Sequence, residues 1–341
     1  METKPIPVPP PDKRIDWRLD PPYNARHLLL LLLALAVIMV TGHRVEMDRM
    51  LVMTGQAVGY VVGVTEDSQV VRGISRVAET MWPPVIGDQE EVGRLPGLDR
   101  ANLPPFSYIE TREIVEQKLN PETLQLEKHS EIKEYLVRPA GYLWTVLIKM
   151  LETLEIALWG TILSVLLSLP LAYYAARNYS PNRYAYVASR ATISMLRSMP
   201  ELIIALFLVL AFGFGPIAGV LALGLHAAGF LGKFYAEDIE NADKKPQEAL
   251  EAIGAGKLKT LLYGVLPQVA PQFIAYTLYI LDRNLRMATV VGLVGAGGIG
   301  QELKGRFDMF QYGHVSTILI AIFLAVFLLD QLSARLRAKL I

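Results

Sequence analysis

The sequence predicts an all-α polytopic membrane protein with about six transmembrane helices and an extracytoplasmic insertion after the first helix. The 341 residues are 52% apolar and their mean hydropathy is positive, as is typical of membrane proteins. Several apolar runs are long enough to cross a bilayer. A short segment between two of these runs, and the segment after the last run, contain Lys or Arg but no acidic residue, as expected for cytoplasmic segments.

The first of these runs follows a Pro-rich, charged segment, residues 1–26, which we expect to be disordered and cytoplasmic. Residues 28–40 are unbroken apolar sequence that rises about 20 Å as a helix, short of the bilayer core. A cleaved signal peptide is therefore an alternative. Because no small-x-small cleavage signal follows in 41–44, we interpret 27–44 as an uncleaved first transmembrane helix.

Residues 45–140 contain no run that could cross a bilayer, and they include the proline pairs Pro83–Pro84 and Pro104–Pro105. Residues 119–134 are charged and loosely helical in pattern. We interpret the whole region as one irregular extracytoplasmic insertion. Residues 141–151 have aromatic residues and a lysine near their ends, which is typical of an interfacial helix leading into the next span.

The core, residues 141–341, is predicted to hold five further spans, of which the fourth is interrupted by charges. The predicted spans are Leu154–Ala176, Ala191–Phe212, Pro216–Phe234, Val269–Val291 and Val315–Leu332.

Charge orients these spans. The loop 177–190 carries three Arg and no acid, and the tail after residue 332 and the N-terminal segment are also basic. An excess of basic residues marks the cytoplasmic side, and the alternation of spans puts all three segments on that side. Both termini and the polar loop 241–267 are therefore predicted to be cytoplasmic, with 45–140 on the outside.

Composition excludes several classes of function. Lys plus Arg equals Asp plus Glu, 33 each, so nothing favours a nucleic-acid partner. The chain has no Cys, and its five His form no HExxH motif, which argues against a metal site. No GxxxxGK[ST] motif occurs, so the chain has no P-loop of its own for ATP. We expect no catalytic residues, no metal and no bound cofactor.

The loop Glu248–Pro267, EALEAIGAGKLKTLLYGVLP, is the most informative segment. It resembles the coupling loop of ABC-importer permeases, with the pattern Glu-Ala-Ala, three residues, Gly, nine residues, Ile-x-Leu-Pro. Leu250 replaces the second Ala and Gly264 the Ile. The resemblance implies that this loop docks on an ATPase subunit, through the matching residues Glu248, Ala249, Gly254, Leu266 and Pro267.

An ordinary amphipathic cytoplasmic loop is the alternative, because the segment also has a helical apolar stripe: Leu250, Ile253, Leu258, Leu261 and Leu262. The small residues Ala249, Gly254 and Gly256 would let another backbone approach closely. Pro267 is suited to the first turn of the next membrane helix.

The resemblance extends over residues 152–338, through segments such as ETLEIALWGTILSVLLSLPLAYYAARN, RSMPELI, YGVLPQVAPQF and NLRMATVVGLVGAGGIGQEL. Together these segments resemble the permease subunit of phosphonate importers, and residues 87–140 look like an insertion relative to that family. The resemblance implies the type I ABC-importer permease fold, a bacterial inner membrane location and an oxyanion solute: phosphonate, phosphite or phosphate ester.

The same resemblance implies the partners. These are a second permease chain, which we expect to be identical, two ABC ATPase subunits that hold ATP and Mg²⁺, and an extracytoplasmic binding protein. Two alternatives remain open: a permease for another small solute such as methionine, or a membrane anchor or assembly protein that transports nothing.

Residues 295–300, GAGGIG, satisfy GxGxxG. A dinucleotide fold would also need an acidic residue about 20 positions later, where this chain has apolar sequence. Flexibility and close helix packing are one explanation for the glycines. The other is a hinge at the outer mouth of a solute path, where the amides of Gly297 and Gly298 would face an anion.

Charges within the spans are costly and usually face a bundle interior or a water-filled cavity. Arg197 and Glu201 are four residues apart, which predicts an internal ion pair on one helix face, with a kink at Pro200. His226, in mid-span, is predicted to be a hydrogen bonder in helix packing rather than a proton relay.

Arg283 and Arg286 lie three residues apart near the predicted outer end of their span. Guanidinium groups bind phosphonate or phosphate in a bidentate manner, so these two residues are candidates for the solute path. Neighbouring Asp282 is predicted to neutralise one of them.

Overall fold

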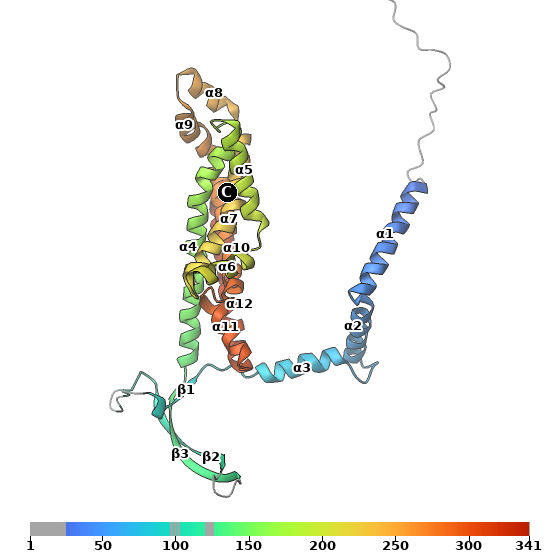
Figure 1. Cartoon of the computed structure of the whole chain (residues 1–341), viewed down its shortest axis with the longest axis vertical. Helices are drawn as coiled ribbons and strands as arrows, with labels where there is room; N and C mark the ends of the chain where they lie inside the picture. Colours follow the sequence, from blue (N-terminus) through green and yellow to red (C-terminus); the bar gives the residue numbers. More distant parts are fainter. Residues whose placement is uncertain (1–24, 96–97, 99, 101–102, 120–125, 341) are drawn as a thin grey trace, which may run out of the picture. The chain divides into compact units, whose positions relative to one another are not determined.

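The computed structural model describes residues 25–95, 98, 100, 103–119 and 126–340, and the chain divides into two units at residues 78 and 79 (Figure 1). The part of the predicted disordered N-terminus before residue 25 lies outside the described residues. Each unit is described separately.

The first unit is helical, with α1 (Ala25–Arg44), α2 (Met47–Val62) and the larger part of α3 (Gln69–Met81). Residues Arg26–Arg44 are long and apolar enough to cross a membrane, and the leucine side chains of 28–33 are all exposed. This helix matches the predicted first span in position and length. The start of the predicted irregular insertion is instead two helices.

The second unit begins with a three-stranded antiparallel sheet, which corrects the all-α prediction. Its strands are β1 (Asp88–Glu91), β2 (Tyr108–Leu119) and β3 (Leu126–Arg138), in the order β1-β3-β2, with a short 3₁₀ turn at Val92–Arg94. The predicted helical segment 119–134 therefore lies largely in β3. Its many charges fit a helix equally well, but β3 has a partner in β2 over the whole register from Tyr108↔Val137 to Leu119↔Leu126.

The bundle consists of α4 (Gly141–Ala175), α5 (Arg183–Ser198), α6 (Glu201–Phe212), α7 (Pro216–Asn241), α10 (Leu266–Gly292), α11 (Gly298–Asp308) and α12 (Tyr312–Leu340). The predicted interfacial helix 141–151 and the span after it are one continuous helix, α4. The predicted span 191–212 is two helices, α5 and α6, bent by 91°.

By length and composition, the described residues contain four candidate membrane spans, α1, α4, α7 and α12, or five if the bent pair α5–α6 is one span. The predicted span 269–291 is a helix, α10, but it is not among these candidates because polar residues lower its hydropathy.

The centre of the bundle is α7, which packs on α4, α5, α6 and α10. Small residues on α7 let its neighbours approach closely. A Cβ at Gly224 would lie 2.6 Å from a Leu163 methyl carbon, and one at Gly229 would lie 3.0 Å from the Arg197 backbone nitrogen. The close approach at Gly229 brings the end of α5, which carries the Arg197 side chain, against α7.

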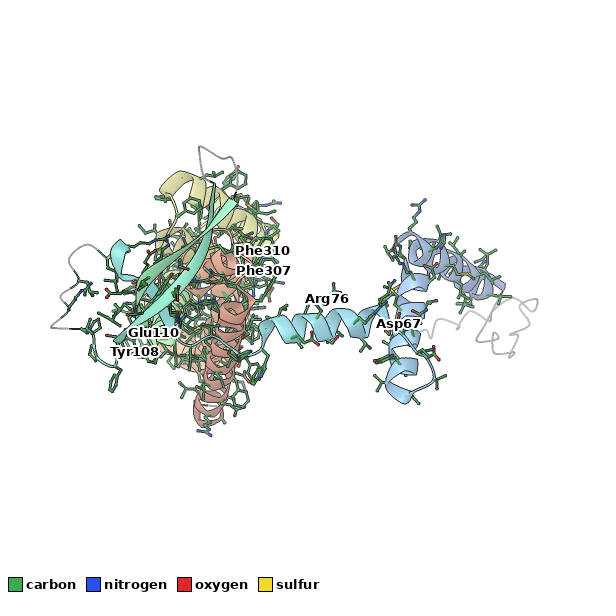
Figure 2. The ribbon with its side chains drawn as sticks, turned by 90° about the horizontal axis from the view of Figure 1, so that it is seen from below. Asp67, Arg76, Tyr108, Glu110, Phe307 and Phe310 are labelled. Carbon is green, nitrogen blue, oxygen red and sulfur yellow. The ribbon has the colours of Figure 1, made fainter. Side chains whose placement is uncertain are left out.

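The sheet and the loop between α7 and α10 lie at opposite ends of this bundle (Figure 1). Figure 2 looks onto the sheet end, where Tyr108 and Glu110 lie on β2 and Phe307 and Phe310 lie at the end of α11. Arg138 of β3 pairs with Asp88 of β1 at 2.6 Å and so joins two strands of the sheet. The segment before β1 is fixed to the bundle by Thr317 of α12, whose hydroxyl donates to the Val85 carbonyl at 2.6 Å.

Candidate coupling loop and solute path

The predicted coupling loop 241–267 folds as two short helices, α8 (Lys244–Ala252) and α9 (Lys257–Thr260), followed by a π-helical segment, Leu261–Val265. Helix α8 begins at Asp243, whose carboxylate accepts a hydrogen bond from the Lys245 backbone N–H at 3.1 Å. Pro267 lies in the first turn of α10, as predicted. The loop therefore continues directly into a long helix of the bundle.

Gly254 ends α8 in a left-handed conformation, with φ of 86°. Its N–H donates to the Glu251 carbonyl at 2.9 Å, and the Ala255 N–H donates to the Leu250 carbonyl at 3.0 Å. This pair of bonds is a Schellman motif, which favours glycine because a side chain is strained at positive φ. Among the described residues, its chain neighbours aside, no atom lies within 4 Å of a Cβ built at Gly254, so the space beside it is open.

The outer surface of the loop is apolar at several positions. Ile253 is 80% exposed, and Leu258, Leu262 and Tyr263 are exposed as well, while Leu261 is buried. Of the residues that match the coupling pattern, Glu248, Ala249, Gly254 and Pro267 are exposed and Leu266 is half-buried. Exposed apolar residues beside polar ones are typical of a protein interaction site.

Side-chain hydrogen bonds fix the loop to the bundle. The Tyr179 hydroxyl donates to Gln247 of α8 at 2.8 Å, and the Asp243 N–H donates to Gln268 of α10 at 3.0 Å. Burial, and then the nearby Glu251 carboxylate, raise the pKa of Tyr179, so its hydroxyl keeps the proton that it donates. The loop is therefore held at both ends.

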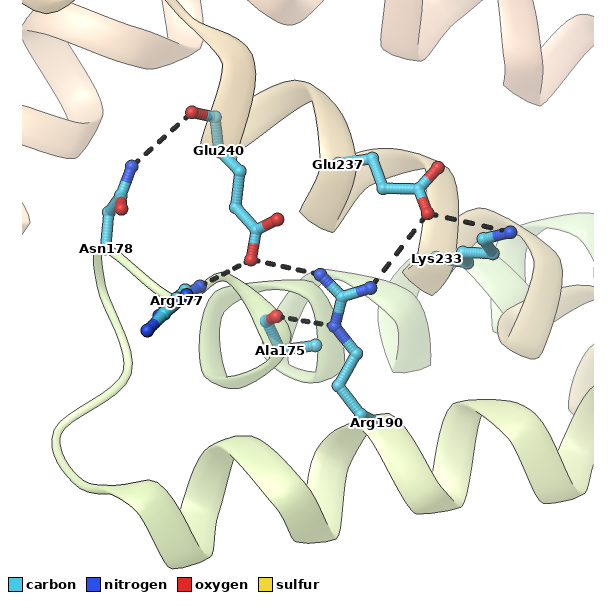
Figure 3. A network of polar contacts seen from close by, with 7 residues as sticks. All are labelled: Ala175, Arg177, Asn178, Arg190, Lys233, Glu237 and Glu240. Carbon is cyan, nitrogen blue, oxygen red and sulfur yellow. Dashed lines mark hydrogen bonds and ion pairs between the residues drawn. The ribbon is translucent and has the colours of Figure 1, made fainter. Parts of the chain in front are cut away.

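A second group of contacts lies where α7 enters the loop (Figure 3). The Arg190 guanidinium of α5 donates to Glu240 of α7 at 3.0 Å and to the Ala175 carbonyl at the end of α4 at 3.0 Å. The same Glu240 carboxylate accepts the Arg177 backbone N–H at 2.7 Å. One arginine and one glutamate thus join three helices immediately before the loop 241–267.

The predicted ion pair between Arg197 and Glu201 is wrong. Glu201 instead pairs with Arg283 of α10 and lies 3.0 Å from His226 of α7. The reason is Pro200, where α5 ends and α6 begins at an angle of 91°. The four-residue spacing puts two side chains on one face only within a continuous helix.

Glu201 and His226 are nearly buried, with side chains 13% and 6% exposed. His226 Nδ1 lies 2.9 Å from the Met199 carbonyl oxygen, an acceptor, so Nδ1 carries the proton and donates. Its Nε2 is then able to accept from Arg283, 3.0 Å away. His226 is thus a hydrogen bonder between helices, as predicted, and it also joins the Glu201–Arg283 pair.

Arg197 has no carboxylate partner among the described residues. Its Nε is buried without a hydrogen-bond partner, and its guanidinium lies 5.3 Å from the centre of the Phe230 ring. The Arg283 guanidinium lies 4.7 Å from the same ring. Two cations therefore share one aromatic ring, and only one of them is neutralised.

Arg286 pairs with Asp282 at 2.7 Å, so Asp282 does neutralise one of the two predicted path arginines. The Asp282 side chain is buried, whereas that of Arg286 is 49% exposed. Arg286 therefore presents its remaining donors at the surface of this chain, toward the C-terminal end of α10.

The glycine-rich segment has a structural role, which is the first of the two explanations that the sequence leaves open. The Gly298 N–H donates to the Glu152 carboxylate of α4 at 3.0 Å, and the Ile299 N–H donates to the Thr153 hydroxyl at 2.7 Å. These bonds cap the N-terminus of α11. Gly297 and Gly298 are buried and have positive φ, and the Gly298 amide is not free for a solute.

One feature of α10 escaped the sequence analysis. Besides the two arginines, the exposed or half-buried polar side chains of this helix include Gln272, Tyr276 and Tyr279. Their spacing of four and three residues places them on one side of the helix together with the two arginines. This spacing could have been read from the sequence, but the charged residues of the span drew attention instead.

Comparison with known proteins agrees with this arrangement. Residues 168–341 match the family described as "Binding-protein-dependent transport system inner membrane component". The chain is 71% identical over 261 residues to the protein named "Putative phosphite transport system permease protein HtxE" of Stutzerimonas stutzeri, covering 76% of this chain and 100% of that one. It is 46% identical to the phosphite transport system permease protein PtxC of the same organism, covering 55% of this chain and 68% of that one.

Among solved structures, the chain is similar to the MetNI methionine ABC transporter in inward-facing conformations. The TM-score is 0.52 at 20% identity, over 58% of this chain and 97% of that one. At this identity the likeness shows the fold alone. The match to the family covers half of this chain, and the match to HtxE covers the whole of that permease. The chain belongs to the inner membrane components of binding-protein-dependent transport systems, and it is an ABC transporter permease rather than an enzyme.

Proposed function

We propose that this permease forms the translocation path of an ATP-driven importer for a small phosphorus oxyanion of the phosphite or phosphonate class. The observation that carries the proposal is the 71% identity to HtxE over the full length of that protein, together with the phosphite transport named for PtxC. Arginines within the bundle support it, because guanidinium groups suit such anions. Methionine is less favoured, because the likeness to MetNI is in fold only, at 20% identity.

A transporter is also favoured over a membrane anchor. Charges within a membrane are costly, and an anchor has no need of them, whereas a path for an anion does. We therefore include Arg283 and Arg286 among the residues of the path. Arg283 also stabilises the bundle through Glu201, so Arg286, with the more exposed side chain, is the stronger contact of the two.

The partners in this proposal are a second copy of the permease, two ATPase subunits with ATP and Mg²⁺, and an extracytoplasmic binding protein. The ATPases dock on α8, α9 and the apolar residues exposed around them. When the ATPases close, they move the loop, and α10 transmits the movement because it begins where the loop ends. The path then changes from inward-facing to outward-facing, a two-state change driven by a ligand bound elsewhere.

We further propose six spans, with α10 as the sixth despite its lower hydropathy, and both termini in the cytoplasm. A helix of 27 residues is long enough to cross a bilayer, and a polar face is tolerated where it lines water. The coupling loop then lies in the cytoplasm and the sheet outside.

The solute is tested by growth. A strain that lacks its own phosphite and phosphonate permeases, and that can oxidise phosphite, would receive the complete transport system with this chain. We expect growth on phosphite or a phosphonate as sole phosphorus source, and none when this chain is omitted. Growth on neither compound, with the chain present in the membrane at normal amounts, contradicts the proposed solute class.

Topology is tested with single cysteines, which the Cys-free chain allows without background. Phe106 in the sheet region, Tyr184 near the start of α5 and Ile253 in the coupling loop are 94%, 87% and 80% exposed, so a thiol at each is accessible. An impermeant maleimide added to intact cells, after removal of the outer membrane, should label Phe106→Cys alone. It should label Tyr184→Cys and Ile253→Cys only after permeabilisation. Labelling of Ile253→Cys in intact cells would reverse the orientation.

A further inference from the structure

We propose that one polar face of α10 is the wall of the path along which the oxyanion moves. This inference rests on the proposed function and adds specific residues to it. The face consists of residues 272, 276, 279, 283 and 286, which follow each other at intervals of four, three, four and three residues. Such intervals place side chains in one row along a helix. We call the row Gln272, Tyr276, Tyr279, Arg283 and Arg286 the donor row.

The donor row is accessible in this chain, while much of the other side of α10 is buried. Tyr279 is 54% exposed, and Gln272 and Arg286 are also exposed. The opposite side of α10 carries Leu285, which is fully buried, and Asn284, which donates to Thr161 of α4 at 3.0 Å. The helix is therefore fixed to the bundle by one side and presents polar groups on the other.

The chemistry of the donor row fits an oxyanion. Every member carries N–H or O–H donors, and none is acidic. Both carboxylates nearby are paired with an arginine: Glu201 with Arg283, and the buried Asp282 with Arg286. An anion that moves along the row would therefore meet donors and no exposed carboxylate.

The length of the donor row fits a path rather than a single binding site. From residue 272 to residue 286 the helix rises about 21 Å, most of the thickness of the bilayer core, which is about 30 Å. Within the row, the Gln272 amide donates to the Tyr276 hydroxyl at 3.1 Å. Consecutive donors are therefore close enough to pass an anion from one to the next.

A lipid-facing position is excluded for this row on energetic grounds. Arginine and glutamine side chains in hydrocarbon lack hydrogen-bond partners, so such groups face water or protein. Arg197 adds a positive charge at the same level, because it shares the Phe230 ring with Arg283 and has no carboxylate partner among the described residues. The bundle thus has one cation in excess beside the donor row, as an anion path requires.

The test uses the accessibility of a thiol in the assembled transporter, in membrane vesicles. The probe is the anionic reagent sulfonatoethyl methanethiosulfonate, which reacts in water and not in lipid. Tyr279→Cys places the thiol in the donor row. Ile274→Cys is the matched control, because Ile274 is also exposed, at 42%, but lies about 140° around the helix from residue 279.

We expect Tyr279→Cys to react, and excess phosphite to slow the reaction, while Ile274→Cys does not react. An unreactive Tyr279→Cys, with the exposed Tyr184→Cys reacting in the same vesicles, overturns the inference, and so does equal reaction at 274 and 279. If Tyr279→Cys reacts but phosphite gives no protection whereas methionine does, the water-filled path is supported and the proposed solute class fails.

Tyr279→Phe provides a second measurement, which needs no thiol labelling. The substitution leaves the aromatic ring in place. The variant loses only the hydroxyl, so the KM for phosphite uptake should rise by about threefold to tenfold, which corresponds to one hydrogen bond, with unchanged amounts of protein. Ile274→Val should leave the KM unchanged. An unchanged KM in Tyr279→Phe contradicts a contact between Tyr279 and the solute.

Discussion

Replacing Gly254 by Val should reduce solute uptake by about tenfold, because a β-branched residue in the left-handed conformation costs roughly 1–2 kcal/mol and shifts the end of α8 away from its docking geometry. Transport-coupled ATP hydrolysis should fall in parallel. The amount of permease in the membrane should be normal, since no described residue beyond its chain neighbours has an atom within 4 Å of a Cβ at this position. Uptake and ATP hydrolysis are measured in proteoliposomes with the ATPase subunits and the binding protein.

The chain offers two matched controls for this experiment. Gly256 lies two residues away, with an ordinary φ of −74° and equally open surroundings, so Gly256→Ala should be neutral. Gly254→Asn should retain more uptake than Gly254→Val, because Asn tolerates positive φ. A Gly254→Val variant with the uptake of Gly256→Ala would show that the Schellman motif of α8 is not needed for coupling. A Gly254→Asp variant adds a charge to the same surface and should be at least as defective as Gly254→Val.

Replacing Glu201 by Gln should destabilise the bundle by about 3–5 kcal/mol, because it leaves the Arg283 guanidinium without its counter-charge in a largely buried site. The expected result is a large loss of monodisperse protein after solubilisation and a lower Tm in the protein that remains. Glu201→Gln combined with Arg283→Gln should recover part of this loss, since neither buried charge is then left alone.

Arg197→Gln distinguishes the two possible pairings of Glu201. If Glu201 were paired within its own span, Arg197→Gln would cause the same loss as Glu201→Gln. In the structure Arg197 is not the partner of Glu201, so its replacement should leave yield and Tm much closer to the wild type. Lys304→Gln breaks an exposed pair with Asp308 and should change stability by about 1 kcal/mol or less. Equal losses in Arg197→Gln and Glu201→Gln would contradict the assigned pairing.

The sequence is sufficient to predict the helices whose apolar character is continuous. The candidate spans α1, α7 and α12 lie close to their predicted positions because long apolar runs are determined locally. The membership of the family was also predictable, because the coupling pattern depends on residues at fixed intervals in one short segment. The glycine at position 254 is a clear example, since one backbone conformation accounts for it.

The errors concern contacts between elements that are distant in the sequence. The sequence of β3 resembles that of a charged helix, and only its pairing with β2 shows it to be a strand. The sequence contains no local signal of that pairing. Glu201 pairs with a residue 82 positions away because Pro200 breaks the helix on which its predicted partner lies. The Gly298 amide, for which the sequence leaves two explanations open, is occupied by Glu152, 146 positions earlier in the chain. In each case the tertiary fold supplies a partner that spacing alone does not indicate.

The contacts of Arg190 have a mechanical consequence. Because this guanidinium and the Glu240 carboxylate join the ends of α4, α5 and α7, these three ends resist bending relative to one another. A force applied at the neighbouring loop would then move the three helix ends together as a rigid body. The bundle must bend at a more flexible point of its backbone. The break at Pro200, between α5 and α6, is such a point, since its helical hydrogen bonds are already interrupted. Because the ends of α4, α5 and α7 are rigid and the break at Pro200 is flexible, a small movement of the loop would tilt α6 beside the Glu201–Arg283 pair.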